Sequence, residues 1–448
     1  RYNVVKSQYY LPAIMTAKPR IVVLGGGFAG LNLVKRLDKE KFDIILVDRH
    51  NYHTFPPLFY QVASSELDPT SICFPFRREF QKRKARGVRF HTGEVKSIDI
   101  ERKCVTTDYE TIPYDKLVIA LGTTNNFFGN PKLIDEVYTL KSTDEAIRIR
   151  NEILFRCERA AIEPDEEKRR RMLSFVVIGG GPAGVEIAGA IGELKRYILK
   201  RDYPEIPIDD LSITIVEGTD RLLGTMSPES SATALRALGQ LMVTVKLGRL
   251  MKAYENNEIT LDDGSKLYSE MVIWTAGVTG VPLSFTGKTP DGQATFAAGR
   301  GGRYQTDAFC RVEGLADVYA IGDINLLPTE KYPKGLPQLA QVAIQQGRFL
   351  AENLNDDRWD KPFSYVDKGS MATIGRNRAV ADLHKLHLDG FVAWLAWMFI
   401  HLISLLGMRS KTSVLISWIW AYFSYNTALR LLLFGSKYPK RGSMWDKG

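Results

Sequence analysis

Two stretches of this sequence show the same order of residue types: RIVVLGGGFAGLNLVKRL at residues 20–37 and SFVVIGGGPAGVEIAGAIGEL at residues 174–194. Each has a β-branched apolar run, a glycine cluster and then an amphipathic segment, which predicts a strand, a tight turn and a helix. The first glycines of the two clusters are 154 positions apart, and Gly122 and Gly277, which end later buried runs, are 155 apart. The sequence therefore predicts one α/β unit that occurs twice.

The glycine spacing predicts a dinucleotide site in each unit. In a Gly-x-Gly-x-x-Gly turn the first glycine makes the turn, the second lets the backbone approach a pyrophosphate, and the third lets the helix pack closely on the strand. An acid at the end of the next strand binds ribose hydroxyls, and Asp48 and Glu217 end such strands. The first site is assigned Gly25, Gly27, Phe28, Ala29, Gly30, Asp48, Arg49 and Gly122, and the second Gly179, Gly181, Pro182, Ala183, Gly184, Glu217 and Gly277.

Composition and charge exclude several other classes of protein. A chain of 448 residues is long enough for two or three cores. The net charge of +9 has no long basic block behind it, so no nucleic-acid partner is expected. The four cysteines have no CxxC spacing, which predicts a reducing compartment, no structural metal site and no redox disulfide.

Two dinucleotide sites in one chain predict two dinucleotides. The simplest pair is a non-covalently held FAD and an NADH that binds and leaves as a substrate. The carboxylate of Glu217 favours NADH over NADPH because it would repel a 2′-phosphate, although Arg221, four residues later, has the opposite effect.

With these motifs the sequence resembles the two-dinucleotide-binding-domain flavoproteins of glutathione-reductase-like fold. In that family an inserted NAD domain splits the FAD domain, which resumes at a Gly-Asp motif that GLADVYAIGD (314–323) matches. The resemblance implies that Asp323 binds FAD and that Val95 lies on a strand whose backbone contacts the adenine. It implies an N-terminal extension (1–17), an FAD domain in two parts (18–128 and 303–370), an NADH domain (129–302) and a C-terminal membrane-associated domain (371–448).

Two further stretches narrow the resemblance. NYHTFPPLFYQVAS (51–64) and LPQLAQVAIQQGRFLAENL (336–354) are similar to signatures of the type II NADH dehydrogenases, the single-chain NADH:quinone oxidoreductases. The resemblance implies that Pro57 shapes the wall beside the flavin ring and that Ala340 and Gln341 bind FAD. A helix beginning near Leu339 would aim its N-terminal dipole at the flavin, and Gln341 and Gln345 would act on flavin and quinone carbonyls. A solvated polar helix face is the alternative.

The implied reaction passes a hydride from NADH to FAD and then two electrons to a membrane quinone, ubiquinone or menaquinone, without proton pumping. Glu186, one turn into the second glycine-rich helix, is implied to position NADH and to act in catalysis; its alternative is an acid favoured by the helix dipole. Rival activities on this fold are sulfide:quinone or ferredoxin and rubredoxin reduction, and a non-catalytic NADH-sensing flavoprotein is a third alternative.

The C-terminal stretch 390–434 is strongly apolar and rich in tryptophan. Its first run, of about 16 residues, is shorter than the roughly 20 that a spanning helix needs. The second run contains several polar residues, so helices lying on the bilayer surface are favoured over a spanning hairpin or a dimerisation pair. A peripheral location on the cytoplasmic face of a bacterial inner membrane is expected, with a homodimer as the assembly.

Two more residues are quinone-site candidates beside Gln341 and Gln345. His401 lies on the first apolar run and offers a hydrogen bond or a proton to a quinone oxygen. A histidine bonded to a backbone carbonyl is the alternative. Lys368 is a second cationic candidate, with an exposed strand lysine as its alternative.

Overall fold

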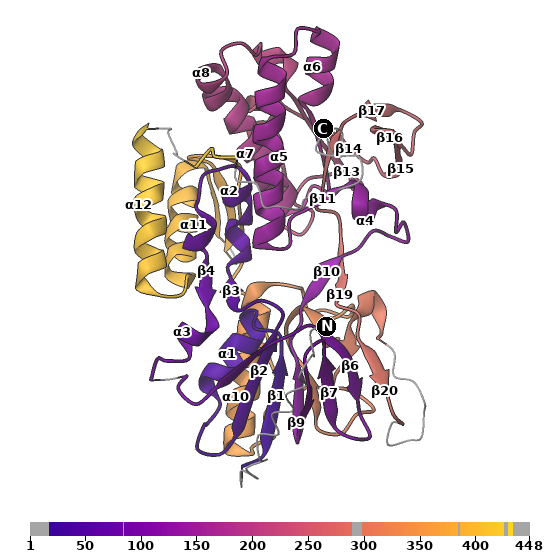
Figure 1. The fold of residues 1–448 in the computed structure, drawn as a ribbon, viewed down its shortest axis with the longest axis vertical. Coiled ribbons are helices and arrows are strands. Elements are labelled where there is room, and N and C mark those ends of the chain that lie inside the picture. Colours follow the sequence, from indigo (N-terminus) through magenta and orange to yellow (C-terminus); the bar gives the residue numbers. More distant parts are fainter. Residues whose placement is uncertain (1–17, 84, 289–297, 384–385, 425–428, 433–448) are drawn as a thin grey trace, which may run out of the picture. The chain divides into compact units, whose positions relative to one another are not determined.

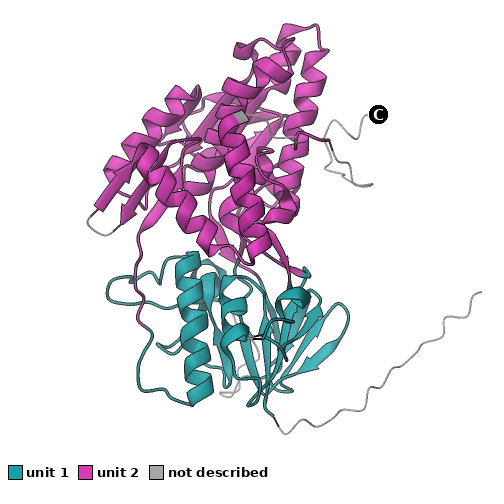
Figure 2. Ribbon diagram, turned by 90° about the vertical axis from the view of Figure 1, so that its left-hand side faces the viewer, with its two compact units in different colours: residues 1–51, 76–122, 282–363 teal, residues 52–75, 123–281, 364–448 magenta. Residues whose placement is uncertain are grey.

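The computed structural model describes residues 18–83, 85–288, 298–383, 386–424 and 429–432, so the predicted extension 1–17 lies outside the described residues. The chain divides into two compact units, each assembled from three segments (Figure 2). Unit 1 is Arg1–Asn51, Phe76–Gly122 and Pro282–Phe363, and unit 2 is Tyr52–Pro75, Thr123–Val281 and Ser364–Gly448. Each unit holds a five-stranded parallel sheet with helices against it, which confirms the predicted α/β fold with two Rossmann-like halves.

The sheet of unit 1 has the strand order β22-β9-β1-β2-β5. Its central strand β1 is fully buried from Ile21 to Leu24, as expected for a parallel strand covered on both faces. Helices α1 and α10 lie side by side against it (Figure 1). The bounds are β1 (Arg20–Leu24), β2 (Asp43–Asp48), β5 (Arg89–Thr92), β9 (Lys116–Ile119), β22 (Val318–Ala320), α1 (Phe28–Arg36) and α10 (Ala340–Asp356).

A second sheet of unit 1 has the order β20-β6-β7-β8. It is formed by β6 (Val95–Asp99), β7 (Cys104–Thr107), β8 (Thr111–Pro113) and β20 (Ser284–Thr286). The smaller elements of the unit are α3 (Phe76–Glu79), η5 (Arg300–Gly302), β21 (Tyr304–Gln305), η6 (Gly322–Ile324) and β23 (Asn325–Leu326).

The sheet of unit 2 has the corresponding order β11-β18-β12-β13-β14. Helix α7 (Pro182–Glu193) follows its central strand and continues without a break into a π-helical turn, η3 (Leu194–Leu199). The strands are β11 (Tyr138–Thr139), β12 (Ser174–Ile178), β13 (Ser212–Glu217), β14 (Val243–Leu247) and β18 (Met271–Trp274). The other helices are α4 (Leu133–Glu136), α5 (Thr143–Ala161), α6 (Glu166–Met172), α8 (Lys200–Asp202), η4 (Ile208–Asp210) and α9 (Pro228–Gln240).

Small sheets complete the nucleotide-binding part of unit 2. They are the pair β10 (Thr123–Asn125) and β19 (Val278–Gly280), and the meander β15 (Met251–Glu255), β16 (Glu258–Leu261) and β17 (Lys266–Tyr268). The segment 52–75 also belongs to unit 2, although it falls inside the predicted first FAD segment, 18–128. Its helix α2 (Phe59–Ala63) packs on α5 and α7. Its other elements are β3 (Tyr52–Thr54), η1 (Pro56–Leu58), η2 (Pro69–Ser71) and β4 (Cys73–Pro75).

The C-terminal part of unit 2 is a three-stranded sheet followed by two helices. Helix α11 buries Ala393 and Trp397, four residues apart, and α12 buries Val414 and Trp418 in the same way. Among the described residues, no helix combines the length and apolar character needed to cross a bilayer. The bounds are β24 (Ser370–Thr373), β25 (Ala379–Leu383), β26 (Leu386–Asp389), α11 (Gly390–Ser404) and α12 (Met408–Ser424).

Candidate dinucleotide and redox sites

The first glycine cradle, in unit 1, has the geometry that a pyrophosphate needs. Gly25 has φ +98°, a conformation that favours glycine. A Cβ on Gly30 would lie 1.9 Å from the carbonyl oxygen of Gly25, so only glycine lets α1 start this close to β1. A Cβ built on Gly27 would meet no heavy atom within 4 Å, which leaves open space in front of the helix N-terminus. The N–H groups of Phe28 and Ala29, the first residues of α1, therefore suit a bound phosphate.

Asp48 is fixed at the end of β2, at the edge of this cradle. Its Oδ2 accepts a hydrogen bond from the Gly26 amide at 2.7 Å, and its Oδ1 accepts one from the His50 amide at 2.8 Å. Burial raises the pKa of Asp48, while the two backbone donors favour its charged form. Each carboxylate oxygen keeps a lone pair for a ribose hydroxyl, so the residue fits its predicted role.

The second cradle, in unit 2, repeats these contacts closely. Gly179 has φ +112°, and a Cβ on Gly184 would again lie 1.9 Å from the carbonyl oxygen of the first glycine. A Cβ on Gly181 would meet nothing within 4 Å, and α7 begins directly after it with Pro182 and Ala183. Both cradles therefore fit a dinucleotide.

Glu217 takes the place of Asp48 in unit 2. Its Oε2 accepts from the Gly180 amide at 2.5 Å, and its Oε1 accepts from the Thr219 amide at 2.7 Å. Arg221, which weakened the preference for NADH, donates to the carbonyl oxygen of Gly224 at 2.9 Å. Its guanidinium is thereby tied to its own loop.

The remaining predicted nucleotide residues lie at the expected element ends. Gly122 and Gly277 have φ +68° and +78°, and a Cβ on Gly277 would lie 2.6 Å from the ring of Phe128. Val95 begins β6, as predicted, and is half-buried. Arg49 is exposed next to Asp48.

The Gly-Asp motif of unit 1 is held by a glutamine that the sequence reasoning did not assign. Gln346, fully buried on α10, accepts from the Gly322 amide at 2.7 Å and donates to Asn325 Oδ1 at 3.1 Å. The carbonyl oxygen of Asp323 accepts from Gln338 at 3.0 Å. The side chain of Asp323 is therefore presented by a turn that is braced on both sides. The signal in the sequence was the pair of adjacent glutamines at 345–346. Adjacent helix residues point about 100° apart, so one of the two is turned toward the protein interior.

The predicted helix start near Leu339 is confirmed, because Leu339 is the N-cap and Ala340 the first residue of α10. Gln341 and Gln345 are half-buried and one helical turn apart. Pro57 lies in η1, which belongs to unit 2. The structure thus brings Ala340, Gln341 and Gln345 together on one element of unit 1.

Glu186 is part of a hydrogen-bonded chain inside unit 2, which its dipole-based alternative does not explain. Its Oε1 lies 3.5 Å from the amide nitrogen of Thr373, and burial raises its pKa to about 8. The Thr373 hydroxyl lies 2.9 Å from the hydroxyl of Tyr60, which also accepts from Gln61 Nε2 at 2.9 Å. The indole of Trp418 on α12 donates to Gln61 Oε1 at 2.9 Å. The chain therefore joins Glu186 to the C-terminal helices.

His401 is fixed by its own helix. Its Nδ1 lies 2.7 Å from the Trp397 carbonyl oxygen, and its ring stacks on the Trp397 indole with centroids 4.0 Å apart. Burial lowers the pKa of His401 to about 4, so the ring is neutral at pH 7. Because a carbonyl only accepts, Nδ1 carries the ring proton and Nε2 is an acceptor. Lys368, the other cationic candidate, is exposed just before β24.

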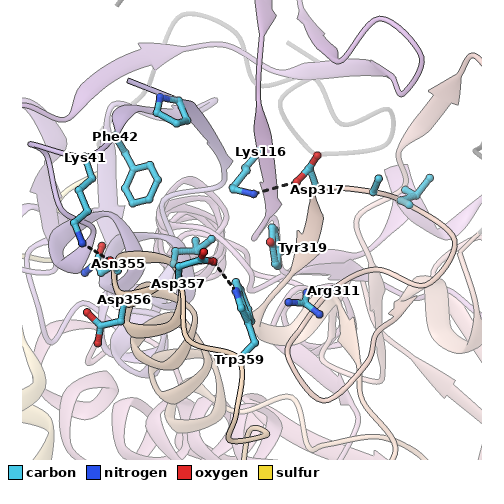
Figure 3. A pocket seen from close by; sticks show the side chains of 14 residues that line it. Lys41, Phe42, Lys116, Arg311, Asp317, Tyr319, Asn355, Asp356, Asp357 and Trp359 are labelled. Carbon is cyan, nitrogen blue, oxygen red and sulfur yellow. Dashed lines mark hydrogen bonds and ion pairs between the residues drawn. The ribbon is translucent and has the colours of Figure 1, made fainter. Parts of the chain in front are cut away.

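A large cavity of about 740 Å³ in unit 1 lies away from the cradle (Figure 3). Its lining includes Pro19, Lys116 and Asp317, each at or just before the start of a strand of the parallel sheet. Dinucleotides bind at the carboxyl ends of such strands, so this cavity is no candidate for FAD.

Comparison with known proteins gives the same class of protein as the two cradles. Residues 19–347 match the family model described as pyridine nucleotide-disulphide oxidoreductase, and residues 368–424 match the NDH2 C-terminal domain. The residues matched to the first of these families include both glycine cradles. With the second match and the relatives below, the chain belongs to the type II NADH dehydrogenases, which confirms the resemblance seen in the sequence.

The first of three similar proteins shows that membership, and the solved structure shows the likeness of fold. A type II NADH:quinone oxidoreductase of Mycobacterium tuberculosis is 33% identical over 91% of this chain and 90% of its own length. An internal alternative NAD(P)H-ubiquinone oxidoreductase of Arabidopsis thaliana mitochondria is 29% identical over 90% of this chain and 84% of its own. The structure of NDH2 from Plasmodium falciparum with NADH has a TM-score of 0.85 at 22% identity, covering 93% of this chain and all of that chain.

Proposed function

We propose that this protein oxidises NADH with a bound FAD and passes the electrons to a membrane quinone, as a respiratory enzyme that pumps no protons. The two glycine cradles carry the proposal, because each fits a dinucleotide and the two differ in their surroundings. Cys73, Cys104, Cys157 and Cys310 have no CxxC spacing, which disfavours a disulfide as the electron acceptor. The same fact disfavours a sulfide:quinone reductase, which needs cysteines beside its flavin.

FAD, when bound, accepts a hydride and gives up two electrons. The residues of the chain bind and orient its partners. The cradle of Gly25, Gly27 and Gly30 would hold the FAD pyrophosphate, with Asp48 on the ribose, and that of Gly179, Gly181 and Gly184 would hold NADH, with Glu217 on its ribose. The overall reaction, NADH + H⁺ + quinone → NAD⁺ + quinol, takes one proton from water. Glu186, which holds a proton at neutral pH, is proposed to act on the NADH side.

The quinone candidates lie on both units. Gln341 and Gln345 offer amide donors from one face of α10. On unit 2 the neutral ring of His401 suits an acceptor role toward a quinol O–H through Nε2, and it is unsuited to delivering a proton. Lys368 offers an exposed cation. If His401→Ala leaves quinone turnover unchanged, the role proposed for this residue fails.

The C-terminal helices are proposed to lie on a lipid surface. Their outward side chains are large and apolar: Val392 is 61% exposed, Phe399 65%, Ile416 60%, Trp420 63% and Phe423 80%. So many large exposed apolar side chains on two successive helices are unusual for a soluble monomer. With Arg409 exposed at the start of α12, this surface suits the headgroup region of an anionic bilayer. A homodimer and a location on the cytoplasmic face of a bacterial inner membrane complete the proposal.

Stopped-flow mixing of the FAD-loaded protein with NADH, and then with a panel of quinones, tests the function. We expect rapid bleaching of the flavin absorption by NADH and rapid recovery with quinone. A chain truncated before Gly390 should still be bleached by NADH, yet lose sedimentation with anionic vesicles and recover more slowly with quinones held in them. Absence of bleaching by NADH contradicts the proposal, and bleaching by sulfide alone favours the sulfide:quinone alternative. Slow recovery with every quinone favours an NADH sensor.

A further inference from the structure

Arg303, a half-buried residue just before β21 in unit 1, joins the two ends of a loop. Its Nε donates to the carbonyl oxygen of Asn325 at 2.9 Å, and its Nη2 donates to the carbonyl oxygens of Asn325 and Leu336 at 2.5 and 2.9 Å. A backbone bond of 3.1 Å from the Leu336 amide to the carbonyl oxygen of Leu327 closes the loop. The rigid fork of a guanidinium suits two acceptors at once, so one side chain holds both ends of the loop.

Each end of this loop leads to a group that is assigned to the FAD site. On one side, Asn325 directly follows η6, the turn that carries Asp323. On the other side, Leu336 lies three residues before the N-cap of α10. Gln338 joins the two sides, because its side chain donates to the carbonyl oxygen of Asp323 at 3.0 Å. Arg303 thus fixes the Asp323 turn relative to the positive end of the α10 dipole.

The same turn packs against the first glycine cradle. Gly322, the first residue of η6, has φ +79°, and a Cβ built on it would lie 3.0 Å from the Cβ of Ala29. Ala29 belongs to the first turn of α1, whose N–H groups suit the pyrophosphate. Helix α10 reaches the same place, since a Cβ on Gly347 would lie 2.4 Å from the carbonyl oxygen of Ala29. The cradle, the Asp323 turn and α10 therefore meet at one residue of unit 1.

The guanidinium of Arg303 is also a charge that acts with Asp323. Burial lowers the pKa of Arg303, and the charge of Asp323 acts in the opposite direction. An arginine stays charged at neutral pH, so this part of unit 1 keeps a fixed positive charge. Gly335, with φ +90°, makes room for the group, because a Cβ there would lie 3.3 Å from Nη1 of Arg303. The loop is thus shaped around the guanidinium.

We propose that Arg303 is a positioning residue for FAD, which holds Asp323 and the N-terminus of α10 in the places where the bound cofactor meets them. The side chain acts through the carbonyl oxygens of Asn325 and Leu336. Its positive charge and the helix dipole that it holds in place both favour a reduced flavin that carries a negative charge. The inference deepens the proposed function and rests on its assignment of the first cradle to FAD.

The test compares Arg303→Gln and Arg303→Lys with the wild type as FAD-loaded full chains. The first readout is the rate of FAD release after dilution, followed by the rise of flavin fluorescence. We expect Arg303→Gln to release FAD about tenfold faster, because the loop loses the charged donor that joins its two ends. Arg303→Lys keeps donors but lacks the fork, so its release should be about threefold faster.

The reduction potential of the bound flavin separates the charge from the hydrogen bonds. A tenfold weaker preference for the reduced flavin corresponds to a potential about 30 mV lower for a two-electron couple, and this is the shift expected for Arg303→Gln. Arg303→Lys keeps the charge, so it should restore most of the potential and only part of the FAD retention. A lower melting temperature of Arg303→Gln with an unchanged release rate and potential would show a role in stability alone and overturns the proposal.

Arg311→Gln is the matched control. Arg311 is also a half-buried arginine of unit 1, but it lies over the indole ring of Trp359 at 4.2 Å and lines the cavity at the opposite edge of the parallel sheet. Its release rate and potential should match those of the wild type. Equally fast release from Arg303→Gln and Arg311→Gln overturns the proposal. If Arg303→Gln does not fold, release at the wild-type rate from Arg303→Lys overturns it instead.

Neither readout needs NADH or quinone, so this inference and the proposed function fail separately. A wild type that NADH does not bleach contradicts the proposed function, while the release of FAD and the potential of the variants still decide the role of Arg303. Rapid turnover of NADH and quinone, together with unchanged FAD release from both Arg303 variants, overturns the inference alone.

Discussion

The two nucleotide-binding units share one cradle and differ in what covers it. In both, a Cβ on the third glycine of the motif would lie 1.9 Å from the carbonyl oxygen of the first. The acid at the end of the next strand accepts from the amide of Gly26 in unit 1 and of Gly180 in unit 2. At one equivalent position on the following helix, however, unit 1 has Asn32 and unit 2 has Glu186. Asn32 donates to the Phe28 carbonyl oxygen on its own helix, while Glu186 enters a chain that reaches α12. The glycine cradle fits a dinucleotide in both units. The two units differ in the elements that pack on the helix after the cradle and in the side chain which that helix presents to them.

The covering elements differ in how tightly they pack. In unit 1, α10 crosses α1 so closely that a Cβ on Gly347 would lie 2.4 Å from the Ala29 carbonyl oxygen. In unit 2, α7 is covered by α2 and by the turn after β24, where a Cβ on Gly189 would lie 3.2 Å from the nearest atom. The tighter cover suits a cofactor that stays bound, and the looser one suits a substrate that exchanges.

The largest expected effect comes from adding a methyl group to the third glycine of each cradle. Gly30→Ala should reduce the bound flavin to less than about a tenth of the wild-type content, because the new Cβ forces α1 away from the Gly25 carbonyl. Gly184→Ala should keep its flavin and slow bleaching by NADH by roughly a hundredfold. The absorbance ratio of flavin to protein and stopped-flow bleaching measure the two effects. Loss of flavin in Gly184→Ala would show that the cradles are not independent.

A glycine-to-alanine substitution should destabilise the contact of α10 with α1 more than the contact of α7 with the turn after β24. Gly347→Ala is expected to lower the free energy of unfolding by about 3 kcal/mol, because its Cβ would meet backbone. Gly189→Ala should cost only about 1 kcal/mol, because its neighbours need to move by a few tenths of an ångström. Thermal unfolding of FAD-loaded protein measures both, and equal losses would contradict the distinction between a tight and a loose cover.

The acid that distinguishes unit 2 should leave a pH signature. Since burial raises the folded pKa of Glu186 to about 8, the folded chain keeps a proton that the unfolded chain gives up above its ordinary pKa. The contribution of Glu186 to stability is therefore complete at pH 4 and is lost as the pH rises to about 8. Glu186→Gln, which does not titrate, should come close to the wild type at pH 5 and exceed its stability by about 5 kcal/mol at pH 9, because the pKa is raised from 4.5 to about 8. A difference in free energy of unfolding between the two proteins that stays constant from pH 5 to 9 would contradict this.

The smallest effects are expected at the ribose acids. Glu217→Gln keeps the hydrogen bond from Gly180 but loses the charge, so KM for NADH should rise about fivefold and the preference over NADPH should shrink by a similar factor. Asp48→Asn should weaken the binding of FAD by a comparable factor, which the release of flavin on dilution measures. A larger change in the preference for NADPH in Asp48→Asn than in Glu217→Gln would reverse the assignment of the two cradles.

Local patterns in the sequence predicted the cradles well, because glycine spacing and strand-terminal acids act over about 30 residues. Residues 52–75 were placed with the FAD segment, since only the packing of α2 on α5 and α7 assigns them to unit 2. A bond from His401 to a backbone carbonyl is the alternative that the sequence offers, and the structure identifies the carbonyl as that of Trp397. No single sequence decides between a solvent-facing histidine and one bonded to its own helix. The hydrogen bond from Trp418 to Gln61 joins residues 357 positions apart, so no spacing in the sequence reveals it.

The π-helical turn η3 has a consequence for comparing related chains. Such a turn holds one residue more than an α-helical turn, and it forms where a single residue is added to an existing helix. Removing one residue between Leu194 and Leu199 would restore a regular helix and rotate the residues beyond it by about 100°. Relatives without the extra residue should align with a one-position gap there. Tyr197, which lines a cavity of about 110 Å³ within unit 2, should then have no counterpart. The distribution of that gap among relatives would show at which branch of the family the extra residue, and with it this part of the cavity wall, appeared.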